Sequence, residues 1–137
     1  MAELKAQGKS PIEIINASAS SGVGNVATGT NPTVEIEFKN ISDKNISLIN
    51  WTIVNINANG KLCANSSEES GFAEVGGIAP GETFTGSSFS SDPQTSDVVV
   101  IIKDLAYDDK VSDYEISMKW ENPDYDTELA AVKNEHK

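Results

Sequence analysis

Strict alternation of apolar and polar residues is the feature that most constrains the fold of this chain. Residues 34–39 read V-E-I-E-F-K, and residues 114–120 read Y-E-I-S-M-K-W. Successive side chains of a β-strand point to opposite faces of the sheet, so this period of two predicts a strand with one buried and one wet face. The two segments therefore predict two β-strands that lie far apart in the chain.

Further strands are predicted where short apolar runs are bounded by turn residues, at residues 12–15, 46–58, 83–89 and 98–102. The last of these reads V-V-V-I-I, and a short run of β-branched residues favours a buried strand over a helix. The chain thus has the pattern of many short strands.

The segment 46–58 has apolar residues on both faces. Ile46 and Leu48 are expected to share one face, and Ile49, Trp51 and Ile53 the other. Apolar residues on both faces indicate a central strand, or a bulge that reverses the alternation. Trp51 is therefore expected in the core, and Trp120 in the last predicted strand is expected there too.

Turn residues separate these strands. Asn59-Gly60 favours a hairpin turn, and I-A-P-G-E at residues 78–82 predicts a type II turn with Gly81 at the position that needs a positive φ. Polar composition predicts a loop or irregular edge strand at residues 18–32, and turns or connections at residues 41–45, 66–77, 90–96 and 107–110.

The chain of 137 residues has the length of one domain. Residues 1–10 form a polar leader or a scar left by cloning, and residues 11–123 form the folded domain. Residues 124–137 form a tail, in which Asp126 could cap a short helix. The predicted fold is all-β: an immunoglobulin-like antiparallel β-sandwich of about seven strands with a short C-terminal tail or helix.

Three motifs give much of the chain a resemblance to a known family. Residues 34–47 read VEIEFKNISDKNIS, residues 78–86 read IAPGETFTG, and residues 98–109 read VVVIIKDLAYDD. They resemble small immunoglobulin-like domains of the FxLYD type in Gram-positive surface proteins and lipoproteins. In such domains one strand ends in N-x-S-D-K and a Pro-Gly-Glu turn opens a later one. An F-x-L-Y-D string itself does not occur. The resemblance implies a sandwich with an accessory role and no catalytic residues.

Charge and composition exclude several functions. The net charge is −11, and all ten basic residues are lysine, which argues against nucleic-acid and anionic membrane partners. The sequence has no apolar run of 18 residues, so no membrane insertion is expected. A single cysteine, Cys63, and a single histidine, His136, exclude an internal disulfide and a zinc finger. We expect no cofactor.

The compartment is predicted from composition. Residues 1–10 lack the apolar segment of a secretory signal. The abundance of Asn, Ser and Thr and the absence of Arg favour an exported bacterial domain, extracellular or at the cell surface, whose signal or anchor is missing here. A cytosolic protein that begins at residue 1 is the alternative.

Two tyrosines in predicted loops are the candidate binding residues. Tyr107 is followed by Asp108 and Asp109, and Tyr125 also lies beside aspartates. An exposed tyrosine flanked by hydrogen-bond acceptors can contact a sugar or a protein, so these four residues predict a site for a protein or cell-wall glycan.

Loop aspartates give weaker candidates for calcium, namely Asp92, Asp97, Asp124 and Asp126. Calcium takes six to eight oxygen ligands, yet the D-x-[DN]-x-[DN]-G pattern is absent, and solubilising turn residues account equally for the acidic loops.

No catalytic residue is predicted. Glu35 and Glu37 share the wet face of one strand, where neighbouring carboxylates are expected without any cleft. Cys63 is expected to be a small buried residue on a strand, and His136 lies one residue from the C-terminus, where rigid positioning is hard to achieve.

The sequence therefore predicts a non-enzymatic binding or spacer domain of an exported bacterial protein. The alternative is an accessory domain of a carbohydrate-active or other carboxylate-dependent hydrolase, which would require two carboxylates that converge in a pocket. A third interpretation is a cytosolic or phage-encoded structural protein that assembles through an exposed sheet edge.

Overall fold

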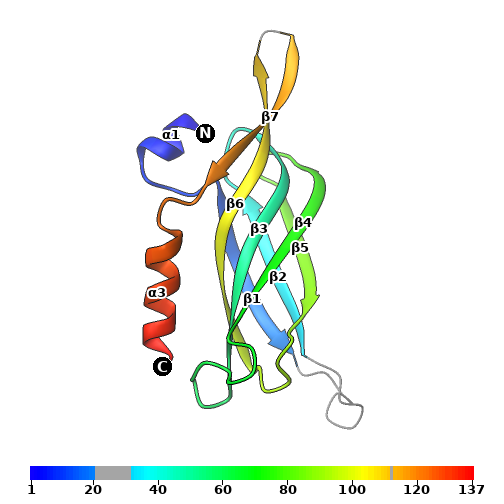
Figure 1. The fold of residues 1–137 in the computed structure, drawn as a ribbon. Helices are drawn as coiled ribbons and strands as arrows, with labels where there is room; N and C mark the ends of the chain where they lie inside the picture. Colours follow the sequence, from blue (N-terminus) through cyan, green and yellow to red (C-terminus); the bar gives the residue numbers. More distant parts are fainter. Residues whose placement is uncertain (21–31, 112) are drawn as a thin grey trace.

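A computed structural model describes residues 1–20, 32–111 and 113–137 of the chain (Figure 1). Two antiparallel sheets pack face to face, one with the strand order β1-β2-β5 and the other with the order β4-β3-β6-β7. The strands are β1 (Ile12–Ser20), β2 (Thr33–Asn40), β3 (Asn45–Ile56), β4 (Glu68–Ile78), β5 (Thr83–Phe89), β6 (Asp97–Val111) and β7 (Tyr114–Glu121). The predicted all-β sandwich is confirmed. Of the predicted loop at 18–32, residues 18–20 belong to β1, and residues 21–31 lie outside the described residues.

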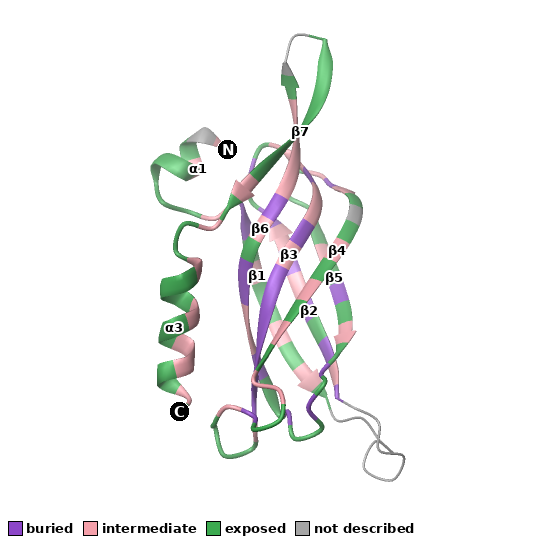
Figure 2. Ribbon diagram, viewed as in Figure 1, coloured by how far each residue is buried: buried purple, intermediate pink, exposed green. Residues whose placement is uncertain are grey.

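The core lies between the two sheets. Its centre is a tilted aromatic pair, Phe38 of β2 and Trp51 of β3, whose ring centroids are 5.2 Å apart. Trp51 is only 3% exposed, as the alternation predicts. Around this pair the inward residues of β2, β3 and β6 are buried, whereas most residues of β7 are exposed (Figure 2). Trp120 is half-buried against the same core.

The strand β3 is central, as predicted, and carries a bulge. Its pairing with both β4 and β6 shifts between Ile46 and Leu48. Relative to β6, Ser47 is an extra residue of β3, and it lets Ile46 and Ile49 both enter the core while Leu48 is only half-buried. The prediction that Ile46 and Leu48 share a face is therefore wrong, because the alternation reverses between these two residues.

Residues 66–77 were expected to form a polar connection, and this expectation is wrong. They contain most of β4, which pairs with β3. The inward residues of β4 are small because they pack against a large ring. A Cβ atom on Gly71 would lie 2.4 Å from Nε1 of Trp51, and Ala73 is the next inward residue packed on the core. A strand with small inward residues and mostly polar outward residues has no apolar period.

The loop predicted at residues 107–110 is also a strand. The strand β6 continues to Val111 and forms a long hairpin with β7 that projects beyond the sandwich (Figure 1). The acidic residues there have partners that hold them in a strand. The Nδ2 group of Asn45 donates to Asp108 at 3.1 Å, and Lys44 pairs with Asp109 at 2.9 Å.

Two predicted turns are confirmed, and a buried asparagine joins them. In the turn at residues 79–82, Gly81 has a φ of +84°, and the N–H of Glu82 donates to the carbonyl of Ala79 at 3.0 Å. The side chain of Asn40 donates to the carbonyls of Ile78 and Lys44 at 2.7 Å each. The sequence N-I-S-D-K thus forms a turn, and Asn40 links this turn to the end of β4, just before the turn at residues 79–82.

Among the described residues, two helices flank the sandwich: α1 (Ala2–Ala6), within the predicted polar leader, and α3 (Tyr125–Glu135), in the predicted tail. The N-cap of α3 is Asp124 rather than Asp126, because the helix begins earlier than its acidic first turn indicated. Leu129 and Val132 lie half-buried on one side of α3. In the described parts of the chain, no helix is both long and apolar enough to cross a membrane.

Candidate functional site

The outer face of the four-stranded sheet is covered in one half. There the hydroxyl groups of Tyr125, the first residue of α3, and Thr52 of β3 are 2.7 Å apart. Lys133 of α3 pairs with Glu68 of β4 at 2.5 Å. Val54 of β3, which is paired with Glu68, is fully buried. We call this the covered half.

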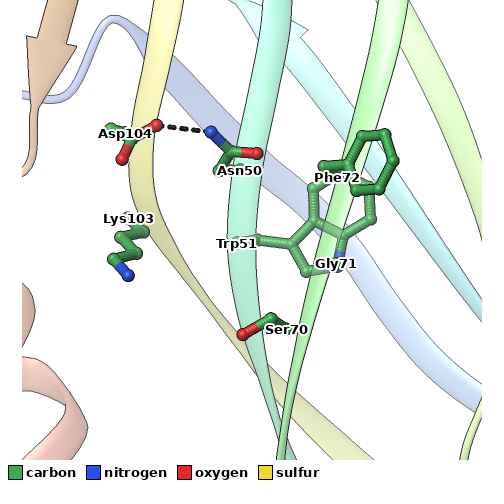
Figure 3. A pocket seen from close by; sticks show the side chains of 7 residues that line it. All are labelled: Asn50, Trp51, Ser70, Gly71, Phe72, Lys103 and Asp104. Atoms are coloured by element: carbon green, nitrogen blue, oxygen red, sulfur yellow. Dashed lines mark hydrogen bonds between the residues drawn. The ribbon is translucent and has the colours of Figure 1, made fainter.

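The other half of the same face is open and contains a hollow of about 370 Å³. Three neighbouring strands contribute its lining, which includes Asn50, Ser70, Gly71, Phe72, Lys103 and Asp104 (Figure 3). The register explains this gathering, because Asn50 of β3 lies directly between Phe72 of β4 and Asp104 of β6. We call this the outer-face hollow.

An amide–carboxylate pair forms one wall of the outer-face hollow. The Nδ2 group of Asn50 donates to Oδ1 of Asp104 at 2.6 Å (Figure 3). Oδ2 of Asp104 lies 3.8 Å from the ammonium of Lys119. The carboxylate of Asp104 thus has Asn50 at one oxygen and Lys119 near the other. The pair still has acceptor capacity, since a carboxylate accepts about four hydrogen bonds and an amide oxygen two.

An exposed aromatic ring forms the opposite wall. Phe72 is 69% exposed, although it lies in the middle of a strand. Beneath it, Trp51 also lines the hollow, and its buried indole N–H has no hydrogen-bond partner among the described residues. On the side toward α3, the ammonium of Lys103 lies 5.8 Å from the ring centroid of Tyr125. The hollow therefore combines an apolar ring with hydrogen-bonding groups.

A second hollow of about 280 Å³ adjoins the first and shares Asn50 and Asp104 with it. It extends over Ala106 of β6 to Ser117 and Lys119 of β7. Together the two hollows make a depression that crosses all four strands of the sheet. This is a long, shallow surface and suits an extended ligand better than a small compact one.

The predicted binding residues do not converge. Tyr107, Asp108 and Asp109 lie on β6 rather than in a loop, and Tyr125 lies in α3. Tyr107 packs against the core, whereas the hydroxyl of Tyr125 bonds Thr52 on the outer face. The hydrogen bond from Lys44 lowers the pKa of the Asp109 carboxyl, and the same bond raises the pKa of the Lys44 ammonium. These side chains have structural partners because they belong to strands and a helix.

The predicted calcium ligands are also dispersed. Asp92 is fully buried, and its carboxylate accepts the backbone N–H groups of Asn65, Ser66 and Gln94 at 2.8–3.1 Å. Asp97 accepts the N–H of Val98, and Asp124 and Asp126 are exposed at the start of α3. Within the described residues, no group of three His, Cys, Asp or Glu side chains is placed to hold a metal ion.

The remaining candidates have structural roles. Glu35 is exposed and Glu37 half-exposed on β2. Cys63 lies in a connection rather than on the expected strand. It is buried, and burial raises the pKa of its thiol, which disfavours the reactive thiolate. The Nδ1 atom of His136 lies 2.9 Å from the carbonyl of Gly60, so this histidine ties the end of α3 to the turn after β3.

Sequence reasoning missed the outer-face hollow because its residues lie on three separate strands. Phe72 fell in a segment predicted to be a connection, and Asn50, Lys103 and Asp104 look like ordinary outward residues. One signal was present: a large apolar residue, Phe72, stands among small and polar neighbours where no core position was expected.

Comparisons with known proteins support the fold. No model of a protein family matches the chain, and no curated protein matches it. A solved structure of a hypothetical protein from Peptoclostridium difficile 630 is similar, with a TM-score of 0.67 and 12% sequence identity. The similarity covers 90% of this chain and 92% of that chain. At this identity it shows that the two proteins share a fold.

Proposed function

We propose that this chain is a non-enzymatic binding domain of an exported bacterial protein, and that the outer-face hollow binds a cell-wall glycan. The observation that carries the proposal is the exposed ring of Phe72 beside the fixed Asn50–Asp104 pair. A sugar ring presents an apolar C–H face and a rim of hydroxyl groups. An aromatic ring can pack on the first while an amide and a carboxylate bind the second.

The shape of the surface supports the same proposal. The depression runs across four strands from Phe72 to Lys119. A polysaccharide chain is extended and can make repeated contacts along such a surface. The exposed serines Ser70 and Ser117 add hydroxyl groups along the path.

Hydrolysis would need two carboxylates with distinct roles across a substrate. At this surface, Asp104 and Glu121 are opposed across β6 and β7. Lys119 lies between them, 3.8 Å from Asp104 and 3.3 Å from Glu121. This arrangement is a three-membered ion-pair group on a sheet surface, which favours binding over acid–base chemistry. A catalytic unit elsewhere in a longer hydrolase would be compatible with the same binding role.

The experiment compares two exposed phenylalanines. Phe72→Ala removes the proposed platform, and Phe89→Ala removes a ring that is 72% exposed on β5, which belongs to the other sheet. Binding to soluble peptidoglycan fragments and cell-wall polysaccharides is measured by calorimetry. We expect Phe72→Ala to weaken binding at least about tenfold, or 1.4 kcal/mol, and Phe89→Ala to leave it unchanged.

A conservative polar variant sharpens the result. Asp104→Asn keeps the size of the side chain and removes its charge, so it should also weaken glycan binding, with an unchanged melting temperature. Equal loss in the Phe72→Ala and Phe89→Ala variants would contradict the assignment of the hollow. Cleavage of any of these polysaccharides by the wild-type chain would contradict the non-enzymatic role.

A further inference from the structure

The last strand has an apolar side that the single chain leaves open. The sequence of β7, Y-E-I-S-M-K-W-E, alternates as a half-buried strand does. Yet Tyr114 is 75% exposed, and Ile116 and Met118 are 39% exposed each. Alternation of this kind normally indicates that one face of the strand is buried. Here the folded chain does not supply the cover that the pattern implies.

The register shows which side this is. Met118 lies opposite Tyr107, and Ile116 lies opposite Asp109. Since Tyr107 packs against the core, the apolar side of β7 continues the core-facing side of the sheet. The hairpin projects past the end of the sandwich (Figure 1), where the other sheet no longer covers it and its surface is largely exposed (Figure 2).

The backbone edge of β7 is open where the hairpin projects, whereas its last residues, Lys119 to Glu121, line a hollow together with Met1 and Lys5 at α1. Among the described strands β7 ends its sheet, with β6 as its one neighbour. Its pairing with β6 has no register shift, and the strand contains no proline. Edge strands in soluble proteins are usually blocked by prolines, bulges or covering segments, because an open edge accepts another strand. The projecting part of β7 has neither a proline nor a bulge.

We propose that two copies of this chain associate through β7, antiparallel, about a two-fold axis at Ser117. In this register Ile116 of each copy lies opposite Met118 of the other. Tyr114 likewise lies opposite Trp120. All four residues are on the apolar side of the strand. The two four-stranded sheets become one continuous sheet, and an isologous interface of this kind is the commonest form of homodimer.

Charge complementarity selects this register. With the axis at Ser117, Glu115 of each copy faces Lys119 of the other, which gives two opposed ion pairs. An axis at Met118 would place Glu115 against Glu121, two like charges. An axis at Ile116 would place Glu115 against Ser117 and Lys119 against Asp113, which lies in the turn before β7. Of these three registers, the one centred on Ser117 is the one that forms both ion pairs between residues of β7 itself.

The dimer is expected to be weak. Each copy carries a net charge of −11, so two copies repel each other, although salt at about 0.15 M screens charges beyond about 8 Å. A two-fold axis normal to the sheet also places both outer-face hollows on the same side. If the proposed function holds, one polymer could contact both hollows, which would raise its avidity without any new contact.

Cysteine crosslinking tests the axis. In the proposed dimer, Ser117 of one copy lies opposite Ser117 of the other. Opposed residues of antiparallel strands have Cα atoms about 4.5–5.5 Å apart, which is within the range of a disulfide. Mild oxidation of Ser117→Cys should give a covalent dimer. Ser87→Cys, at an exposed serine of β5, should stay mostly monomeric, and the wild-type chain with its buried Cys63 gives the background. Equal crosslinking of the two variants would overturn the proposal.

Charge exchange tests the register, by sedimentation from about 10 μM to about 1 mM, where weak association is populated. The wild type should dimerise within this range. Glu115→Lys and Lys119→Glu should each shift the chain toward monomer, and the two together should restore the dimer. The control Glu35→Lys, exposed on β2, changes the charge equally and should not weaken association. Thermal melts establish that each variant is folded.

A wild-type chain that stays monomeric throughout the range, or a folded double variant that does not recover, overturns the proposal. The proposal is also overturned if the chain stays monomeric and binds a strand-forming peptide at β7, since the edge would then bind a different partner. Neither result bears on glycan binding by Phe72 and Asp104, which is measured separately in dilute protein.

Discussion

The two halves of the outer face of the four-stranded sheet differ in what covers them. In the covered half, β3 presents Thr52 and Val54, which are both buried. In the open half, the same strand presents Leu48 and Asn50, which are half-exposed. The pairing of β3 with β4 has no register shift between Leu48 and Val54, so the change in residue type follows from the cover that α3 provides.

This difference indicates which residues are explained by folding. Thr52 and Val54 are accounted for by burial and by the bond to Tyr125. In the open half, burial explains Trp51 beneath the surface but leaves Phe72 without a folding role, since its ring is exposed. An exposed ring beside an ordered amide–carboxylate pair is typical of a binding surface, which is why we propose the binding function for the open half.

The largest expected effect separates the two aromatic residues of the open half. Trp51→Ala should lower the free energy of unfolding by about 3–5 kcal/mol, because it empties the centre of the core beside Phe38. Phe72→Ala should change it by no more than about 0.5 kcal/mol. Urea denaturation of both variants measures this. Losses of similar size would mean that Phe72 belongs to the core and not to a binding surface.

The sequence predicted most of the sandwich and little of its surface. Val34, Ile36 and Phe38 lie in the core as the alternation predicts. The alternation is clear because one face of the sheet that contains β2 packs on the core and the other faces water. The strand β4 escaped prediction because Gly71 must make room for the ring of Trp51, a requirement that only the folded arrangement of strands reveals.

The candidate site was beyond local reasoning for a related reason. Asn50, Phe72 and Asp104 come together through strand register, and register depends on the bulges in β3 and β6 pairing. Tyr125 shows the converse error. Its loop-like surroundings indicated an exposed residue, whereas the hydroxyl bonds a buried threonine beneath α3.

A smaller effect is expected in the covered half, where Tyr125→Phe removes the hydroxyl that bonds Thr52. The buried hydroxyl of Thr52 loses its partner, so the free energy of unfolding should fall by about 1–2 kcal/mol. The double variant Thr52→Val with Tyr125→Phe removes both polar groups and should recover most of this loss. Denaturation curves of the single and double variants test the coupling, and purely additive losses would show that the two hydroxyls do not interact.

The smallest expected effect concerns the ion pair at the other end of α3. Glu68 and Lys133 are both about one-third exposed, and pairs that reach water contribute little after their desolvation and ordering are counted. Glu68→Gln keeps the shape of the side chain and should lower the free energy of unfolding by no more than about 0.5 kcal/mol. The difference should vanish at about 1 M salt, where charges are screened within about 3 Å. A loss as large as that of Tyr125→Phe would mean that charge, rather than the bond to Thr52 and the burial of Val54, holds the helix over the covered half.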